Sequence, residues 1–239
     1  MTGTLAITDC RIPKECEKRL GELGFTVLKL PSHPRLGKAV RSHVDMLIFK
    51  HGDTVITTKE YYGIAKEVFD KLFALRPKLR LLLTDEVVCA EYPNDCILNT
   101  LEINGALFCR SETVSRCIKE LAEAEGLKNV SVKQGYPACT VLNVGGRLAI
   151  TADSGMARAL AKEGISVQLI NNGGISLPPY EYGFIGGCAG YRDGKVYFLG
   201  DPMTHPDGKA ITDSIRRAGL EYEALYPGTL LDLGGIHFA

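Results

Sequence analysis

Hydrophobic and polar positions repeat along this chain in a cycle of three apolar strands and one amphipathic helix. Each cycle runs from a first strand through a short turn to a second strand, and then through a helix to a third strand; it occurs five times. Such a period is typical of a repeat architecture. The second strands are the most alike, since two share the letters Leu-Ala-Ile-Thr, and they are expected at 5–9, 55–58, 107–111, 148–153 and 196–201.

The helices are predicted to begin where a second strand ends in Thr, Ser or Asp. These side chains accept a hydrogen bond from an N–H group of the first helical turn. Several helices are expected to stop at a glycine, such as Gly126, Gly164 or Gly219. The helical ranges are 13–23, 59–75, 111–125, 154–163 and 208–218, and the third strands are 25–30, 79–83, 130–133, 167–170 and 222–225.

First strands are expected at 44–50, 97–103, 140–144 and 184–191, but the first cycle has none before Leu5. At the other end of the chain, Thr229–Ile236 has strand composition and no helix after it. Pairing it with Leu5–Thr8 would close a ring and remove an exposed edge. We therefore predict an α/β fold with one domain over residues 1–239, a five-bladed α/β propeller closed by the C-terminal strand. The competing architecture, an open doubly wound sheet, has one strand per helix instead of three.

Composition limits the partners of this fold. Lys plus Arg and Asp plus Glu both number 28, and no basic run interleaved with aromatics suggests a nucleic-acid partner. No apolar run approaches the roughly 20 residues that span a bilayer, so we expect no membrane partner and a cytoplasmic location. The eight cysteines form no Cys-x-x-Cys pair and are expected to be reduced. The five histidines lack ligand spacing, which predicts no metal. The oligomeric state is left open, a homo-oligomer included.

One motif suggests a specific chemistry. Ser42–Phe49 reads Ser-His-Val-Asp-Met-Leu-Ile-Phe and is followed by the turn Gly52–Val55. It resembles the His-x-Asp-Met strand of the guanidine-group modifying enzymes, the pentein superfamily of agmatine deiminase, arginine deiminase and dimethylarginine hydrolases. The resemblance implies that His43 is a general acid/base and that Asp45 holds a guanidinium. Residues two apart in a strand share a face, so both side chains should point together. The alternative is a solvated pair at a strand start.

The same resemblance identifies a nucleophile and a second acid. In that family the nucleophilic cysteine lies two blades after the histidine, and Cys139 stands two blades after His43, at the start of the strand 140–144. The alternative is a core cysteine, since thiols are among the most buried side chains. One blade before the histidine the family has Leu-Glu-Gly-Gly. Leu231–Gly235 reads Leu-Asp-Leu-Gly-Gly here, offset by one residue, which makes Asp232 a candidate for substrate binding.

Two further resemblances concern activity and fold, respectively. Gly234–Phe238 resembles the Gly-Gly-x-His-Cys sequence that ends many deiminases, with Phe238 in place of the nucleophile. This second alignment implies a protein that lacks the nucleophile and is therefore catalytically inactive. Other segments are similar to an uncharacterised bacterial family of the same fold: Val132–Tyr136, Tyr182–Gly187 and His205–Asp207.

The primary hypothesis is a cofactor-free cysteine hydrolase or transferase acting on a small guanidino compound. Cys139 would attack the guanidinium carbon, while Asp45 and Asp232 hold the substrate by bidentate hydrogen bonds. His43 would protonate the leaving amine and then activate water. Asp153 is first an N-cap, and it is also a candidate for substrate binding because the strand-to-helix junctions of a ring lie near one face. The alternative is a non-catalytic binding or sensor protein for a small molecule or protein partner; a ribosome anti-association factor of the same fold is the precedent.

Overall fold

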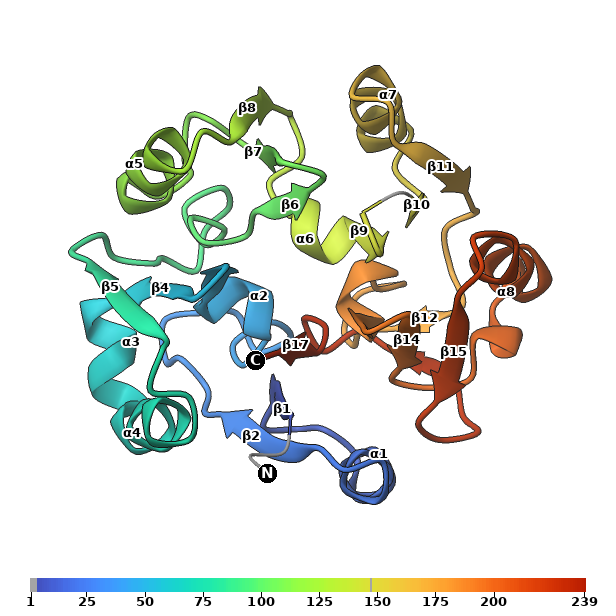
Figure 1. The fold of residues 1–239 in the computed structure, drawn as a ribbon, viewed down its shortest axis with the longest axis horizontal. Coiled ribbons are helices and arrows are strands. Elements are labelled where there is room, and N and C mark those ends of the chain that lie inside the picture. The colour runs from blue at the N-terminus through green and yellow to red at the C-terminus, as the bar shows by residue number, and fades with distance from the viewer. Residues whose placement is uncertain (1–3, 147) are drawn as a thin grey trace.

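The computed structural model describes residues 4–146 and 148–239, which form five three-stranded sheets and one two-stranded sheet. Figure 1 shows the three-stranded sheets arranged around a common centre, with the longer helices at the periphery. In each of these sheets the middle strand is antiparallel to one neighbour and parallel to the other. Within the two described ranges, no sheet closes on itself.

Each three-stranded sheet, together with the helix or helices that follow its middle strand, corresponds to one predicted cycle. The first such unit consists of β1 (Leu5–Asp9), α1 (Lys14–Glu22), β2 (Thr26–Leu30) and, from the far end of the chain, β17 (His237–Phe238). The second holds β3 (Phe49–His51), β4 (Thr54–Thr58), α3 (Lys59–Ile64), α4 (Lys66–Leu75) and β5 (Arg80–Thr84). The third holds β6 (Leu101–Ile103), β7 (Ala106–Cys109), α5 (Arg116–Ala124) and β8 (Lys128–Ser131). The fourth holds β9 (Val141–Val144), β10 (Leu148–Thr151), α7 (Ser154–Lys162) and β11 (Ser166–Leu169). The fifth holds β13 (Ala189–Arg192), β14 (Lys195–Phe198), α8 (Gly208–Arg217) and β15 (Glu221–Ala224).

The helix boundaries follow from local chemistry. The Thr58 side chain accepts a hydrogen bond from the Tyr61 N–H at the start of α3, and Asp153 does the same for two N–H groups of α7. Gly126, Gly164 and Gly219 follow three of the helices with φ of 68°, 75° and 74°, a conformation that glycine adopts without strain. Six separate sheets also rule out the single doubly wound sheet.

The predicted first strands are partly wrong, because the extended segments are shorter than predicted. Helical turns occupy Val44–Leu47 and Gly186–Cys188, so β3 and β13 start only after them, and of the predicted strand 97–103 only β6 is extended. The predicted strand 140–144 is confirmed as β9 except for Thr140, which is the last residue of a third helical turn. Every residue of α2 (Val44–Leu47) is buried, and a short apolar run that is buried all round has the same sequence pattern in a strand and in a helix. The three turns are α2 (Val44–Leu47), α6 (Pro137–Thr140) and η1 (Gly186–Cys188).

The predicted pairing of the two chain ends is confirmed, but with different residues. β17 pairs antiparallel with β1, joining Ala6 to Phe238 and Ile7 to His237. The predicted segment Thr229–Ile236 does not reach β1: within it only β16 (Leu230–Leu231) is extended, and β16 pairs with β12 (Ile175–Ser176). Gly234 and Gly235 have φ of 70° and 78°, so the chain turns between β16 and β17.

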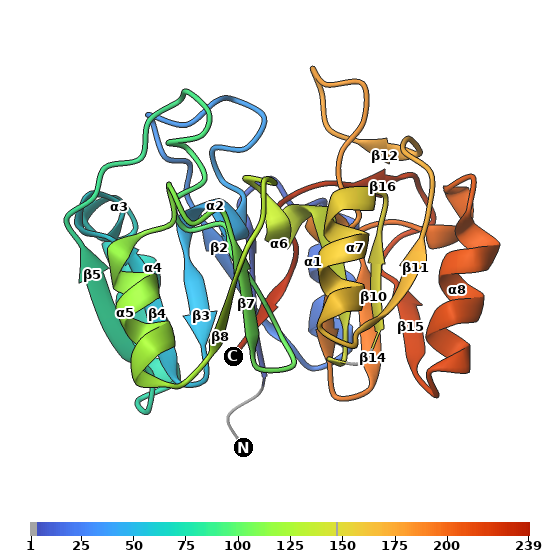
Figure 2. The same cartoon turned by 90° about the horizontal axis from the view of Figure 1, so that it is seen from above.

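Long loops rise on the side of the molecule away from the C-terminus. Figure 2 shows the loops at the top and the C-terminus in the lower half. They are the segments 31–43, 85–100 and 177–185, each of which leads into one of the helical turns or into β6. The loops therefore surround the place where the helical turns meet. No helix in the described ranges is long and apolar enough to cross a membrane.

Candidate active site

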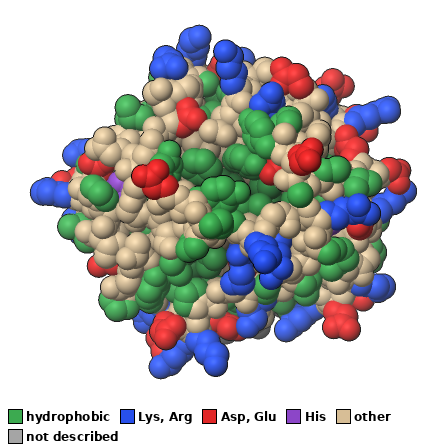
Figure 3. All heavy atoms as spheres, turned by 180° about the vertical axis from the view of Figure 1, so that it is seen from behind, with side chains coloured by type: hydrophobic (Ala, Val, Ile, Leu, Met, Phe, Trp, Pro, Cys, Tyr) green, Lys and Arg blue, Asp and Glu red, His purple; other side chains and the backbone are tan. Residues whose placement is uncertain are grey.

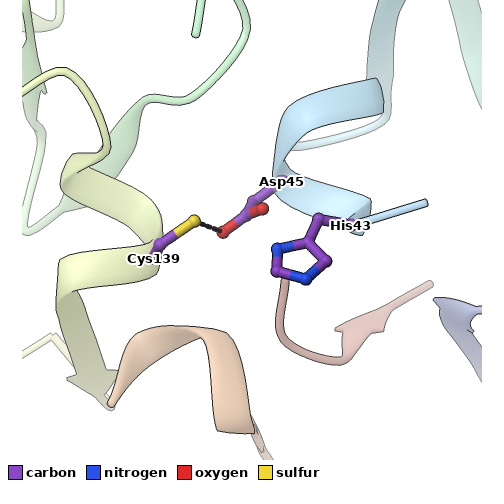
Figure 4. A group of neighbouring side chains, drawn as sticks. All are labelled: His43, Asp45 and Cys139. Carbon is purple, nitrogen blue, oxygen red and sulfur yellow. Dashed lines mark hydrogen bonds between the residues drawn. The ribbon is translucent and has the colours of Figure 1, made fainter. Parts of the chain in front are cut away.

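Three buried side chains from two short helices converge near the centre of the molecule. His43 is the N-cap residue of α2, Asp45 lies in the first turn of α2, and Cys139 lies in α6. Figure 4 shows the three side chains pointing toward one another, and one ligand atom from each lies within 4.8 Å of the others. His43 keeps an extended backbone, with φ −60° and ψ 127°, which explains how His43 and Asp45 face one site although they do not share a strand. His43 and Asp45 therefore lie close to Cys139 as predicted, but short helices position them and not strands.

Cys139 is held from two sides. Its Sγ donates a hydrogen bond to Asp45 Oδ2 at 2.6 Å, across 94 positions of sequence. The Asn99 Nδ2 donates to the same sulfur at 3.1 Å, and the Asn99 Oδ1 accepts from the Ala138 N–H at 2.9 Å. Asn99 thus fixes both the thiol and the start of α6. Sequence reasoning missed Asn99, because a single asparagine in a loop carries no pattern.

Asp232 lies beside His43 and faces the site. The His43 Nδ1 and the Asp232 Oδ1 are 3.7 Å apart, and both residues are buried. Backbone N–H groups of Phe184 and Gly234 donate to the Asp232 carboxylate at 2.8 and 3.2 Å, which fixes its orientation. Gly187 makes this placement possible, because a Cβ there would overlap Asp232 Oδ1.

These residues border a cavity of about 350 Å³ under the long loops. Its lining includes His43, Cys139 and Asp232, together with side chains of the three loops. Figure 3 shows the loop-bearing face, where apolar side chains gather around a central hollow. Asp45 borders a second cavity of about 460 Å³, whose lining also includes His237. The Asp45 and Cys139 pair therefore stands between the two cavities.

Burial sets the protonation state of the ligand-free site. It raises the pKa of Cys139 well above its ordinary value, and the charges of Asp45 and Asp232 raise it further. Burial also raises the pKa of Asp45 to about 6, against the hydrogen bond from Cys139, and raises the pKa of Asp232. It lowers the pKa of His43, against the attraction of Asp232. At neutral pH the free site accordingly holds a thiol and a neutral imidazole, and an incoming cation would favour ionisation of the thiol.

Two sequence-derived candidates lie outside this group. Asp153 caps α7 and accepts a hydrogen bond from Gln134 Nε2 at 2.8 Å, and it lines a separate depression. Phe238, the residue at the nucleophile position in the rival register, packs against Phe25 and Tyr197 with ring centroids 5.1 and 5.4 Å away. The thiol that the structure places beside His43 is that of Cys139.

The same three side chains form a donor set that could hold a metal ion. His, Cys and carboxylate ligands suit Zn²⁺, and no other such group occurs in residues 4–146 and 148–239. A metal would have to displace the proton that Cys139 shares with Asp45, because the ligand is a thiolate. The predicted absence of a metal is therefore a point for experiment.

Buried atoms without partners mark the site as incomplete. Both ring nitrogens of His43 and the Oδ1 of Asp45 have no hydrogen-bond partner within the described part of the chain. Leaving a buried polar group unpaired costs about 1–3 kcal/mol. A ligand with several N–H donors and a positive charge would pair with the Asp45 Oδ1 and with the acceptor nitrogen of the neutral His43 ring.

Comparison with known proteins places the chain in a family and a fold. A family of unknown function (DUF6873) matches residues 7–237, and no curated protein matches the sequence. Dimethylarginine dimethylaminohydrolase from Pseudomonas aeruginosa, complexed with citrulline, is 11% identical, with a TM-score of 0.58 over 92% of this chain and 90% of that one. Agmatine deiminase from C. jejuni is 9% identical, with a TM-score of 0.53 over 90% and 84%. An amidinotransferase of saxitoxin biosynthesis from Microseira wollei is 11% identical, with a TM-score of 0.52 over 92% and 82%. The chain belongs to that family of unknown function, and its fold is that of the pentein superfamily of guanidino-modifying enzymes.

Proposed function

We propose that this protein is a cysteine-dependent, cofactor-free hydrolase or transferase of a small guanidino compound. We also infer that its five three-stranded sheets are the blades of one five-bladed α/β propeller domain over residues 1–239. The observation that carries the functional proposal is the burial of Cys139, Asp45 and His43 within 4.8 Å of one another. The fold shared with dimethylarginine dimethylaminohydrolase and agmatine deiminase supports it.

A guanidinium would be held by the two buried carboxylates. Asp45 offers the unpartnered Oδ1, and Asp232 adds a second negative charge beside His43. Carboxylates bind the planar guanidinium through paired N–H···O bonds, which fix its plane. Its carbon would then lie over the Cys139 sulfur. The bound cation offsets the carboxylate charges that keep the thiol protonated.

The reaction would proceed by covalent catalysis. The Cys139 proton moves to His43, and the thiolate attacks the guanidinium carbon. The His43 imidazolium protonates the departing amine or ammonia, which leaves a thiouronium on Cys139. His43 then takes a proton from water, and the hydroxide adds to the same carbon. The thiolate leaves, and the hydroxyl group on that carbon gives its proton to solvent, which forms the ureido product. Return of the proton from His43 restores the thiol. In a transferase an amine would take the place of water.

Turnover assays with matched variants test this function. Wild-type protein is incubated with agmatine, arginine and methylated arginines, and ammonia, amines and ureido products are measured. Cys139→Ser and Asp45→Asn should abolish turnover, while Cys10→Ser, at an exposed thiol, should leave it unchanged. Activity that survives Cys139→Ser would refute the proposal. Chelation with EDTA adds a further arm, because loss of activity on metal removal would favour a metal-dependent reaction at the same three residues.

A non-catalytic sensor is the second candidate, and the observation that favours it is the burial of the Cys139 thiol against the Asp45 carboxylate, which raises the pKa of the thiol. A thiol that stays protonated binds a ligand without attacking it. In that case guanidino compounds would raise the melting temperature of the wild-type protein with no product formed.

A further inference from the structure

We propose that the cavity selects a guanidino compound that carries a second cationic end and no carboxylate, and that Asp95 and Tyr136 hold this second end. The inference rests on the proposed function for the guanidinium end. It concerns the opposite part of the ligand, for which the pentein fold by itself specifies nothing.

The charge of the cavity lining argues against an amino-acid substrate. Three carboxylates line it, those of Asp95, Glu181 and Asp232, and none of the described residues that line it is Lys or Arg. A substrate carboxylate would thus enter among negative charges, without the cation that normally binds it. A substrate ammonium would find carboxylates and aromatic faces instead.

The basic residues that adjoin the lining in sequence do not alter this charge, and neither does Arg11, which donates hydrogen bonds to the segment that holds them. Lys38 and Arg41 are exposed and are not part of the lining. Arg11 is bound to Asp9, with Nη2 to Oδ2 at 2.5 Å, and it also donates to the backbone carbonyls of Lys38 and Ala39. Its donors are therefore already committed to the protein.

Asp95 has the properties of a receptor for a cation. It is 5% exposed, its Oδ2 accepts a hydrogen bond from the Tyr136 hydroxyl at 2.5 Å, and its Oδ1 has no partner in the described part of the chain. Both residues line the cavity that Cys139 and His43 border. An ammonium N–H would satisfy the free oxygen with a charge-assisted bond, which is stronger than a neutral one. Burial also raises the pKa of Asp95, and a bound cation would oppose that shift.

Tyr136 is itself held in place, so the pair with Asp95 is preorganised. The Gln134 Oε1 accepts from the Tyr136 N–H at 3.1 Å, and the Tyr92 ring packs against the Tyr136 ring with centroids 5.5 Å apart. Tyr180, which lies on the loop 177–185 and is 61% exposed, also contributes to the lining. A cavity of about 350 Å³ matches a small, narrow ligand.

Three probes with the same four-atom spacer separate the contributions of the two ends. Agmatine has a guanidinium and an ammonium, butylguanidine lacks the ammonium, and arginine adds a carboxylate. We expect kcat/KM to fall from agmatine to butylguanidine and to be lowest for arginine. Asp95→Asn should lower kcat/KM for agmatine by about 10- to 100-fold, the worth of a charge-assisted hydrogen bond, and leave butylguanidine unchanged. Asp193→Asn removes an equal charge at an exposed turn residue with φ 48°, which asparagine tolerates, and should change none of the three.

The outcomes distinguish this inference from the proposed function. Preference for arginine, or an Asp95→Asn variant that loses activity equally toward agmatine and butylguanidine, overturns the inference and leaves the cysteine chemistry standing. If the wild-type protein turns over none of the probes, the proposed function fails, and selectivity is then measured as thermal stabilisation of Cys139→Ser by each probe. Stabilisation by agmatine that exceeds the other two and is lost with Asp95→Asn supports the inference, and equal stabilisation by all three refutes it.

Discussion

The Cys139 Sγ lies 2.6 Å from the Asp45 Oδ2, and both residues are only 3% exposed. One proton lies between two groups that would repel each other if both were charged. The thiol therefore stays protonated in the free protein, and loss of its proton is coupled to the charge of Asp45. A nucleophile of this kind becomes active only when a cation shares the site.

Replacing Asp45 should make Cys139 more reactive in the free protein. In the Asp45→Asn variant the amide oxygen would still accept the hydrogen bond from the thiol, but the charge that raises the pKa of Cys139 is removed. We expect Asp45→Asn to speed alkylation of Cys139 by iodoacetamide at pH 8 several-fold, because a lower pKa leaves a larger fraction of the thiol ionised. Mass spectrometry of the peptide that contains Cys139 measures the rate.

Cys188 provides the internal control for this experiment. It is fully buried, and the pKa of its thiol is raised first by burial and then by Asp232, so Asp45→Asn should leave its alkylation rate unchanged. Asn99→Asp should have the opposite effect on Cys139, because it replaces the donor at 3.1 Å with a negative charge. Equal Cys139 rates in wild type and Asp45→Asn would show that the two groups are not coupled.

The same carboxylate should leave a signature in the pH dependence of stability. The pKa of Asp45 is about 6 in the folded protein and 3.8 as the unfolded reference, so the folded state holds its proton more tightly. Stability from this group is present below the unfolded pKa and falls as pH rises through the folded pKa. Between pH of about 4 and about 6, wild type should lose on the order of 2–3 kcal/mol relative to Asp45→Asn. Urea unfolding of both proteins across this range tests it, and parallel curves would contradict the prediction.

The close approach of Gly187 to Asp232 predicts a cost for a single methyl group. A Cβ at position 187 would overlap Asp232 Oδ1, so Gly187→Ala must displace the carboxylate from His43. We expect a loss of about 1–3 kcal/mol in unfolding free energy, together with loss of turnover. Gly21→Ala is the matched control, because nothing lies within 4 Å of that Cβ in α1, and it should stabilise the protein by about 0.5–1 kcal/mol. Full activity in Gly187→Ala would show that the position of the Asp232 carboxylate does not matter for the reaction.

Most of the repeat is predictable from the sequence because strand patterning and capping are local. The strand Leu5–Asp9 has its predicted bounds, and Asp153 is the N-cap of α7 as predicted. The predicted helix 59–75 is interrupted at Ala65, where α3 ends and α4 begins. Boundaries of this kind depend on tertiary packing, which a sequence pattern does not record.

The candidate site is predictable only where a motif marks it. His43, Asp45 and Cys139 are identified by a motif and by their spacing in repeats, whereas the direction of Asp232 follows only from the turn at Gly234. No hydrophobic period marks α2 and α6 as helical turns, since each is only four residues long and mostly buried, and Pro137 at the start of α6 is the one local helix signal there. No motif identifies Asn99, Asp95 or Asp9, because the role of a single polar residue depends on what its side chain contacts.

Asp9, one of those unmarked residues, leads to a prediction about both stability and His43. Asp9 is fully buried, and Arg11 binds its carboxylate through Nε and Nη2, so Arg11→Gln would leave a buried charge without its partner. We expect a loss of about 3 kcal/mol in unfolding free energy, measured in urea. Arg192→Gln, which breaks an exposed pair with Asp193, should cost almost nothing. Because Asp9 raises and Arg11 lowers the pKa of His43, Arg11→Gln should also move the titration of His43 to higher pH, as NMR of the imidazole would detect. An unchanged His43 titration in a folded Arg11→Gln protein would mean that the Asp9 and Arg11 pair has no electrostatic influence on the site.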